Sequence, residues 1–257
     1  MYYFILFFFG AIVGSFLNVL IYRLPRGINW TTKPSHCPNC EKKIRWFHNI
    51  PFFSFIFLRG KCAFCHKKIS LQYPLVEILM GIYVLFFFPH SMEVTAIALF
   101  FFYLAIASIF IVHFFIDLQW RLLLDALNLY LGILFIAYAL WFFPWQHSVF
   151  GSLIGFIIPW SVTWVFFKLR NQVGLGGGDI KLYAVLGLFL GPLGIIYNIF
   201  LSCFLGALLG GSFLILTKKD KNYPIPFGPF ILIVAFAQIF FAEAFLKLIS
   251  SVFLLNS

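Results

Sequence analysis

The sequence predicts an all-α polytopic membrane protein of about eight transmembrane helices, with one small polar insertion between the first two. Of its 257 residues, 63% are hydrophobic, 22% are aromatic and only 10% are charged. A soluble domain of this length would need more charge for its surface. Apolar runs near the ~20 residues that cross a bilayer also follow one another along the chain. Composition and run length therefore agree on the fold class.

The predicted helices lie between charged or turn-rich breaks. The first apolar run has no basic start and no small-residue cleavage site, so we interpret it as a retained helix and not as a signal peptide. The turn between the sixth and seventh spans has an alternative place at "GPLG", Gly191 to Gly194. The expected spans are 2–22, 74–89, 93–116, 124–143, 148–167, 180–198, 199–217 and 228–252.

The basic residues indicate the orientation of these spans. With eight spans, seventeen of the 18 lysines and arginines fall on one side of the membrane, and only Lys247 falls elsewhere. The positive-inside rule identifies that side as the cytoplasm, which places both termini outside. The net charge of +10 is then explained by topology and by anionic lipid, so the bilayer is the expected partner and nucleic acid is not.

Four cysteines lie in the polar insertion, in "CPNC" (Cys37, Cys40) and "CAFC" (Cys62, Cys65). Two such knuckles have the spacing of a four-thiolate zinc site, and four protein ligands leave no position for an activated water. We therefore expect a structural zinc ion. Two disulfides or four free thiols are the alternative, which the reducing cytosol disfavours. The fifth cysteine, Cys203, is expected to be a small buried residue.

Three aspartates fall at the cytoplasmic ends of predicted spans. Asp117 closes the third span, Asp125 opens the fourth, and Asp179 follows three glycines in "GLGGGDIKL". Acidic residues at such positions are costly and indicate function by default. An N-cap role explains Asp125 sufficiently and is an alternative for Asp179. The three glycines are not expected to form stable helix, and they permit close backbone approach. Asp220 lies among lysines in a loop, and its presence there is explained by solubility alone.

Two of these aspartates, if paired, could hydrolyse a peptide bond as an aspartic protease does. Two carboxylates in a site of low dielectric share one proton, so that one activates water while the other polarises a peptide carbonyl. Asp179 is one member of such a pair, and Asp117 or Asp125 is the other, with Asp117 favoured because Asp125 has its capping role. His113 lies on the same helical face as Asp117, which suggests either a metal site or relay, or an interfacial hydrogen bond. No HExxH or GxSxG motif occurs.

Several longer motifs carry a family resemblance over nearly the whole chain. They are "GSFLNVLIYRLP", "HCPNC" with "NIPFFSF", "LRGKCAFC" with "ISLQYPLVE", "FIDLQWRLLLD", "GLGGGDIKL" and "IPFGPF". In this order the sequence closely resembles bacterial type IV prepilin peptidases, which are bifunctional leader peptidases and N-methyltransferases of the GxGD aspartyl protease class. One departure is Leu124, where the family usually has a proline before the second aspartate.

The resemblance implies that Asp117 and Asp179 are the catalytic pair. It implies cleavage of the basic leader of prepilins or pseudopilins at the cytoplasmic face of the bacterial inner membrane. Methylation of the new N-terminal amine by S-adenosylmethionine would follow. It implies three parts: a first transmembrane helix (1–22), a cytoplasmic zinc-binding insertion associated with methyl transfer (23–73), and a membrane-embedded protease domain (74–257).

The residues that bind the methyl donor and the oligomeric state stay open. Glu77 is a candidate for the donor site, with an interfacial carboxylate paired with Arg or Lys as the alternative. Two other functions remain: a protease without methylation, and a carrier or channel whose aspartates bind a proton or cation at a broken helix. Carriers place such groups near the bilayer midplane, whereas these carboxylates are expected at one face.

Overall fold

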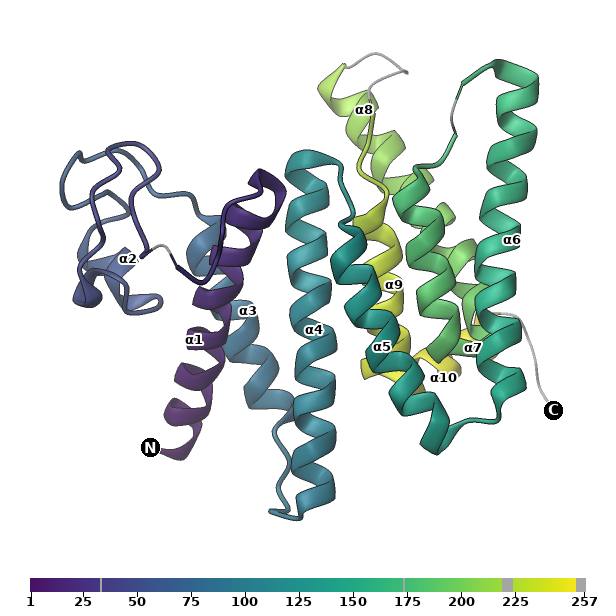
Figure 1. Ribbon diagram of the computed structural model, residues 1–257, viewed down its shortest axis with the longest axis horizontal. Helices are drawn as coiled ribbons and strands as arrows, with labels where there is room; N and C mark the ends of the chain where they lie inside the picture. The colour runs from purple at the N-terminus through teal and green to yellow at the C-terminus, as the bar shows by residue number, and fades with distance from the viewer. Residues whose placement is uncertain (33, 173, 219–223, 253–257) are drawn as a thin grey trace. The chain divides into compact units, whose positions relative to one another are not determined.

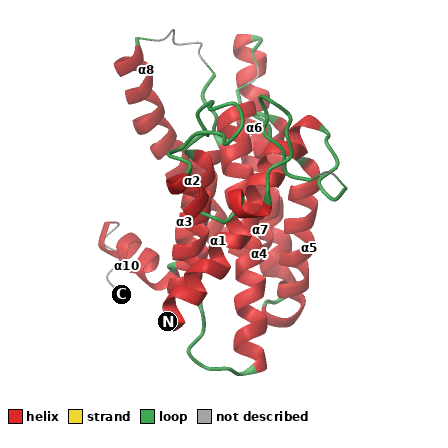
Figure 2. Cartoon of the chain, turned by 90° about the vertical axis from the view of Figure 1, so that its left-hand side faces the viewer, coloured by secondary structure: helices red, strands yellow, loops and turns green. Residues whose placement is uncertain are grey.

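The computed structural model describes residues 1–257 except 33, 173, 219–223 and 253–257. Within the described part the chain is made of helices and loops and has no strand (Figure 2), as the all-α prediction requires. Asp220 lies outside the described residues, as do Lys33, Lys219 and Lys221. The chain forms two compact units, Met1–Val112 and His113–Ser257. The division into a first transmembrane helix (1–22), a zinc-binding insertion (23–73) and a protease domain (74–257) stays a prediction.

In the first unit, helices α1 (Tyr2–Arg23) and α3 (Gln72–Phe87) pack against each other through glycine. A Cβ on Gly10 would lie 2.3 Å from the carbonyl oxygen of Met80, and one on Gly14 would lie 2.7 Å from that of Val76. These two glycines are four residues apart, so they bring one face of α1 against the backbone of α3, as in membrane helix pairs with small-xxx-small spacing.

The insertion between α1 and α3 contains two short 3-10 turns, η1 (Leu24–Arg26) and η2 (Trp46–His48), and one short helix, α2 (Phe53–Phe57). Arg23 organises its first loop. The Arg23 side chain is buried, and its guanidinium donates to the carbonyl oxygens of Asn29 and Trp30 at 3.3 Å and of Pro34 at 3.1 Å. One buried cation thus holds the loop that leads into the first cysteine knuckle.

Helix α4 (Val94–Trp120) contributes to both units, and the remaining helices belong to the second. Helix α7 is central in that unit, because it contacts α5, α6 and α9 (Figure 1). A π-helical turn, Gly206–Gly210, joins α7 to α8. The helices are α5 (Asp125–Phe142), α6 (Trp145–Arg170), α7 (Gly177–Leu205), α8 (Gly211–Thr217), α9 (Gly228–Phe240) and α10 (Ala242–Val252).

Helix α7 folds back on itself at Gly191. The hydroxyls of Tyr183 and Ser202 are 2.5 Å apart, although nineteen residues of straight helix would span about 28 Å. Gly191 has φ 68° and ψ −176°, a conformation that favours glycine, and Pro192 follows it. The predicted boundary between 198 and 199 is therefore wrong. The alternative turn at "GPLG" is confirmed. The part of α7 before Gly191 corresponds to the sixth predicted span. The part after Gly191, together with α8, corresponds to the seventh.

Helices α6 and α7 meet backbone to backbone. A Cβ on Gly151 would lie 2.1 Å from the carbonyl oxygen of Gly187, and a Cβ on Gly187 would lie 2.2 Å from that of Gly151. One turn along α6, a Cβ on Gly155 would lie 2.4 Å from the carbonyl oxygen of Tyr183. Both helices carry glycine at a four-residue spacing, which allows this close approach. We call these contacts the glycine seam.

The predicted membrane spans are mostly recovered as apolar helices. Five helical stretches of the described chain are long and apolar enough to cross a membrane, and α3 and α9 are shorter apolar helices. The predicted span 228–252 is wrong as one helix, because α9 ends at Phe240 and α10 begins at Ala242. Cys203 is exposed on α7, so its predicted burial is also wrong. The five long stretches are Tyr2–Arg26, Val94–Trp120, Asp125–Phe142, Trp145–Arg170 and Gly177–Thr217.

Candidate functional site

Asp117 lies in the last turn of α4 and is 4% exposed. Its Oδ2 accepts a hydrogen bond from the backbone N–H of Gly228, at 3.0 Å. Gly228 is the first residue of α9, so the carboxylate faces the electropositive end of a helix. A Cβ on Gly228 would lie only 2.8 Å from Oδ2. Gly228 therefore lets the backbone reach the carboxylate, which gives a role to the "PFGPF" segment that its sequence alone does not define.

Asp179 is the third residue of α7, whose N-cap is Gly176. The Gly176 N–H and the Asp117 carboxylate both lie close enough to its carboxylate to interact with it electrostatically. The N-cap alternative for Asp179 is thus wrong. The expectation that the three glycines stay outside the helix is also wrong for two of them, because Gly177 and Gly178 form the first turn of α7.

Asp125 does not share the site of the other two aspartates. Leu124 is the N-cap of α5 and Asp125 is its first residue, so the predicted capping role of Asp125 is wrong. Its two carboxylate oxygens instead accept from Nζ of Lys181, each at 2.8 Å. Leu124 has φ −76° and ψ 124°. Proline also adopts this conformation, so the backbone here is one that the proline usual in the family could take.

His113 lies one turn before Asp117 and is fully buried. The side chain of Asn128 on α5, which is also buried, lies close enough to interact with it. The hydrogen bond expected of His113 at the membrane interface receives no support, because neither of its ring nitrogens has a hydrogen-bond partner in the described part of the chain. The metal alternative receives no support either, because the four cysteines are the one group of potential metal ligands found in the described part of the chain.

The three glycines before Asp179 have different surroundings, and this makes a prediction. A Cβ on Gly178 would lie 3.0 Å from Cβ of Leu123, whereas a Cβ on Gly177 would meet nothing within 4 Å. We expect Gly178→Ala to displace the first turn of α7 and to lower the cleavage rate about tenfold. Gly177→Ala is the matched control and should keep full activity, since alanine suits a helix better than glycine does. Equal rates for the two variants would contradict this assignment.

The four cysteines of the insertion converge as a zinc site requires. All four sulfur atoms lie within 4.8 Å of one another, and Sγ of Cys37 and Cys65 are 3.9 Å apart. A tetrahedral ion with Zn–S bonds of about 2.3 Å places its sulfurs about 3.8 Å apart. The Lys67 N–H, together with the Asn39 amide, lowers the pKa of the Cys65 thiol to about 6. The geometry of the four sulfur atoms fits zinc, so this cluster could bind it.

The two knuckles are repeats of one another, a relation that is visible in the sequence but was not among the predictions above. Residues 36–44 read "HCPNCEKKI" and residues 61–69 read "KCAFCHKKI". The Cys37 N–H donates to the Lys42 carbonyl at 3.0 Å, and the Cys62 N–H donates to the Lys67 carbonyl at 2.9 Å. Glu41 and His66, each following the second cysteine of its knuckle, both have φ 56°. The near-identical hydrogen bonds give the cluster its pseudo-symmetric form.

Removal of the metal should unfold the knuckles. The insertion has little apolar core, so metal binding supplies a large part of its folding free energy. We expect a strong chelator, or Cys62→Ser, to make residues 36–69 sensitive to protease while α4–α9 stay protected. Limited proteolysis with mass spectrometry, with and without added zinc, would measure this. Cys203→Ser is the control. Unchanged protection of the knuckles after chelation would show that they fold without metal.

Glu77 on α3 is buried, and its Oε2 accepts from the backbone N–H of Phe52 at 2.7 Å. The Ser15 hydroxyl of α1 is a second partner. Phe52 has φ 62°, an unusual conformation for a bulky residue. Glu77 therefore fastens the insertion to α1 and α3 through a backbone N–H and a hydroxyl. These contacts favour an anchoring role over the binding of a methyl donor.

Comparison with known proteins matches both halves of the chain. Residues 8–91 match the Bacterial Peptidase A24 N-terminal domain, and residues 102–211 match the Type IV leader peptidase family. The proteins named prepilin leader peptidase/N-methyltransferase from Xanthomonas campestris and Stutzerimonas stutzeri are each 34% identical to the chain, over 91% of it and 89% of their own length. The Pseudomonas aeruginosa protein of that name is 33% identical, over 91% and 88%. No solved structure matches the chain.

Proposed function

Because the chain belongs to the type IV leader peptidase family, we propose that it removes the basic leader of prepilins or pseudopilins with Asp117 and Asp179. We propose further that it methylates the new N-terminal amine. One observation carries the first activity. A buried carboxylate, held by the Gly228 N–H, lies within electrostatic reach of a second carboxylate on another helix.

The chemistry follows from placing two such carboxylates together. Two adjacent carboxylates in a buried site share one proton, because both cannot ionise at low cost. The ionised member takes a proton from water, and the water oxygen attacks the peptide carbon. The protonated member donates to the carbonyl oxygen, and the proton taken from water is then passed to the leaving nitrogen. The Gly228 N–H holds Asp117 in place during both steps.

The second activity requires a methyl donor, for which we propose S-adenosylmethionine. This donor supplies a methyl group bound to a positively charged sulfur, which a neutral amine can attack. The zinc-binding insertion is the part of the chain proposed to support this transfer. Glu77 contributes by anchoring the insertion to α1 and α3, through Phe52 and Ser15.

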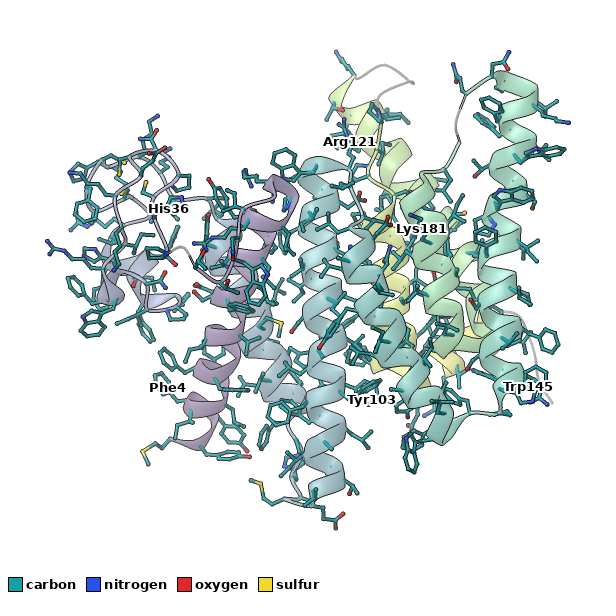
Figure 3. All side chains as sticks on the ribbon, in the orientation of Figure 1. Phe4, His36, Tyr103, Arg121, Trp145 and Lys181 are labelled. Atoms are coloured by element: carbon teal, nitrogen blue, oxygen red, sulfur yellow. The ribbon has the colours of Figure 1, made fainter. Side chains whose placement is uncertain are left out.

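The proposed location is the bacterial inner membrane, with the aspartates at the cytoplasmic face. Figure 3 shows Arg121 and Lys181 toward one end of the helices of the second unit and Trp145 at the opposite end. Basic residues mark the cytoplasmic side of membrane helices, and Asp117 and Asp179 lie within four residues of these two. The same position argues against a carrier, whose ion-binding groups belong at the bilayer midplane.

The two activities can be tested on one substrate. Purified protein in detergent or lipid would be incubated with a prepilin, with and without S-adenosylmethionine, and the products measured by mass spectrometry. We expect loss of the leader in both samples and one added methyl group only with the donor. Cleavage without any methylation would favour the protease alone. No cleavage under any condition would contradict the proposal, and ion flux into vesicles would then test the carrier function.

A further inference from the structure

Asp125 and Lys181 form an exposed ion pair that the cleavage chemistry does not use. Both oxygens of Asp125 lie 2.8 Å from Nζ of Lys181. The side chain of Asp125 is 69% exposed and that of Lys181 is 56% exposed. An ion pair with this exposure contributes little to stability, because water screens it and two side chains lose freedom. Stability alone is therefore a weak reason for its presence.

The pair lies beside the two aspartates of the candidate active site. Lys181 follows Asp179 by two residues, within the first turns of α7. Asp125 follows Leu123 by two residues, at the start of α5. The Leu123 side chain packs against both glycines of the site, at 3.0 Å from a Cβ on Gly178 and at 3.2 Å from one on Gly228. The ion pair thus lies at the same ends of α5 and α7 as the aspartates, within reach of a substrate segment that extends beyond them.

The charges of this region make Asp125 unusual. The described part of the second unit has four acidic residues: Asp117, Asp125, Asp179 and Glu243. Asp117 is buried and interacts with Asp179, and Glu243 lies in the first turn of α10, beyond the far end of α9 from Gly228. Asp125 is therefore the exposed carboxylate beside the site. Two basic residues, Arg121 and Lys181, lie toward the same end of the helices of this unit (Figure 3).

We propose that Asp125 binds a basic side chain of the substrate's leader and that Lys181 is the internal cation which this side chain displaces. The proposal rests on the proposed function, since it takes the leader to be basic. A carboxylate offers about four lone-pair sites, and an exposed one can exchange one ammonium or guanidinium group for another. In the free enzyme Lys181 neutralises Asp125 and competes for it. The pair thus makes affinity depend on the charge of the leader.

This assignment predicts opposite effects for the two halves of one ion pair. Asp125→Asn removes the acceptor and should raise KM about two- to fivefold, the range of an exposed ionic contact. Lys181→Gln removes the competitor and should lower KM by a similar factor. The turnover number should change little in either variant. A purely structural ion pair would behave differently, because loss of either partner would impair the enzyme in the same direction.

The test measures KM and kcat for two prepilins, one with its basic leader and one whose leader lysines and arginines are replaced by glutamine. Lys168→Gln and Glu243→Gln are the controls, since each removes the same charge from an exposed position away from the pair. We expect the two opposite shifts only with the basic leader, and neither control should reproduce them. Folding of each variant would be checked by its thermal unfolding in detergent.

Three outcomes would overturn the proposal. They are shifts of the same sign in both variants, an equal shift with the neutral leader, and a fall in KM for Lys168→Gln as large as that for Lys181→Gln. Failure of the proposed function has a different signature, because the wild-type protein would then cut neither prepilin. In that case this inference fails together with the function on which it rests.

Discussion

Asparagine in place of Asp117 or of Asp179 is expected to lower the rate of leader cleavage by about a thousandfold or more. An amide has nearly the shape of a carboxylate, but it cannot take a proton from water or carry one to the carbonyl oxygen. Loss of a positioned general acid or base typically costs about a hundred- to ten-thousandfold. The Asp117 amide can still accept from the Gly228 N–H, so the fold should persist.

Two comparisons make this result specific. Methylation of a pilin supplied without its leader should continue in both variants, because it does not use the aspartate pair. Asp125→Asn should keep its turnover number, because Asp125 pairs with Lys181 and not with Asp179. Rapid cleavage by Asp117→Asn, together with loss of cleavage in Asp125→Asn, would instead make Asp125 the partner of Asp179.

Alanine at Gly187 is expected to destabilise the second unit by about 3 kcal/mol or more, at the upper end of what overpacking costs. Its Cβ would lie 2.2 Å from the Gly151 carbonyl oxygen, which is backbone and cannot rotate away. The helices would have to separate along the glycine seam. Unfolding in mixed micelles of increasing denaturing detergent, followed by tryptophan fluorescence, would measure the change.

Gly132→Ala is the matched control for this prediction. Gly132 is also a buried helical glycine, on α5, but a Cβ there would lie 3.9 Å from its nearest neighbours, the methyl groups of Val185. This is ordinary van der Waals contact, so the variant should be as stable as the wild type or slightly more so. Equal stability of Gly187→Ala and Gly132→Ala would mean that the seam is less tightly packed than its geometry indicates.

Features that local sequence determines were the ones that could be predicted. Apolar runs follow from the cost of placing backbone and side chains in lipid, and they gave the all-α fold and most of the spans. The two cysteine knuckles have a fixed spacing, and their sulfur atoms do converge. Aspartate is rare in this chain, and three of its four aspartates, Asp117, Asp125 and Asp179, fall near ends of predicted spans. They could therefore be selected as candidates from the sequence.

Features that depend on packing between helices could not be predicted. Asp125 opens α5 as an N-cap residue would, yet the neighbouring α7 supplies Lys181, and the ion pair replaces the capping role. The break between α9 and α10 at Phe241 has no proline or glycine near it from which it could be predicted. The hydrogen bond from Gly228 to Asp117 joins residues 111 positions apart, so nothing near either of them in sequence could have indicated it.

The location of the three groups of the site has a consequence for the lipid around it. Asp117, Asp179 and the Gly228 N–H lie on three separate helices, α4, α7 and α9. The distances between these three groups therefore depend on the tilt of the three helices relative to one another. Bilayers that are thicker or thinner than a helix change its tilt, and displacements of about 1 Å can change a rate about a hundredfold. Bilayer thickness should therefore act as a regulator of this enzyme, with an optimum acyl-chain length for cleavage.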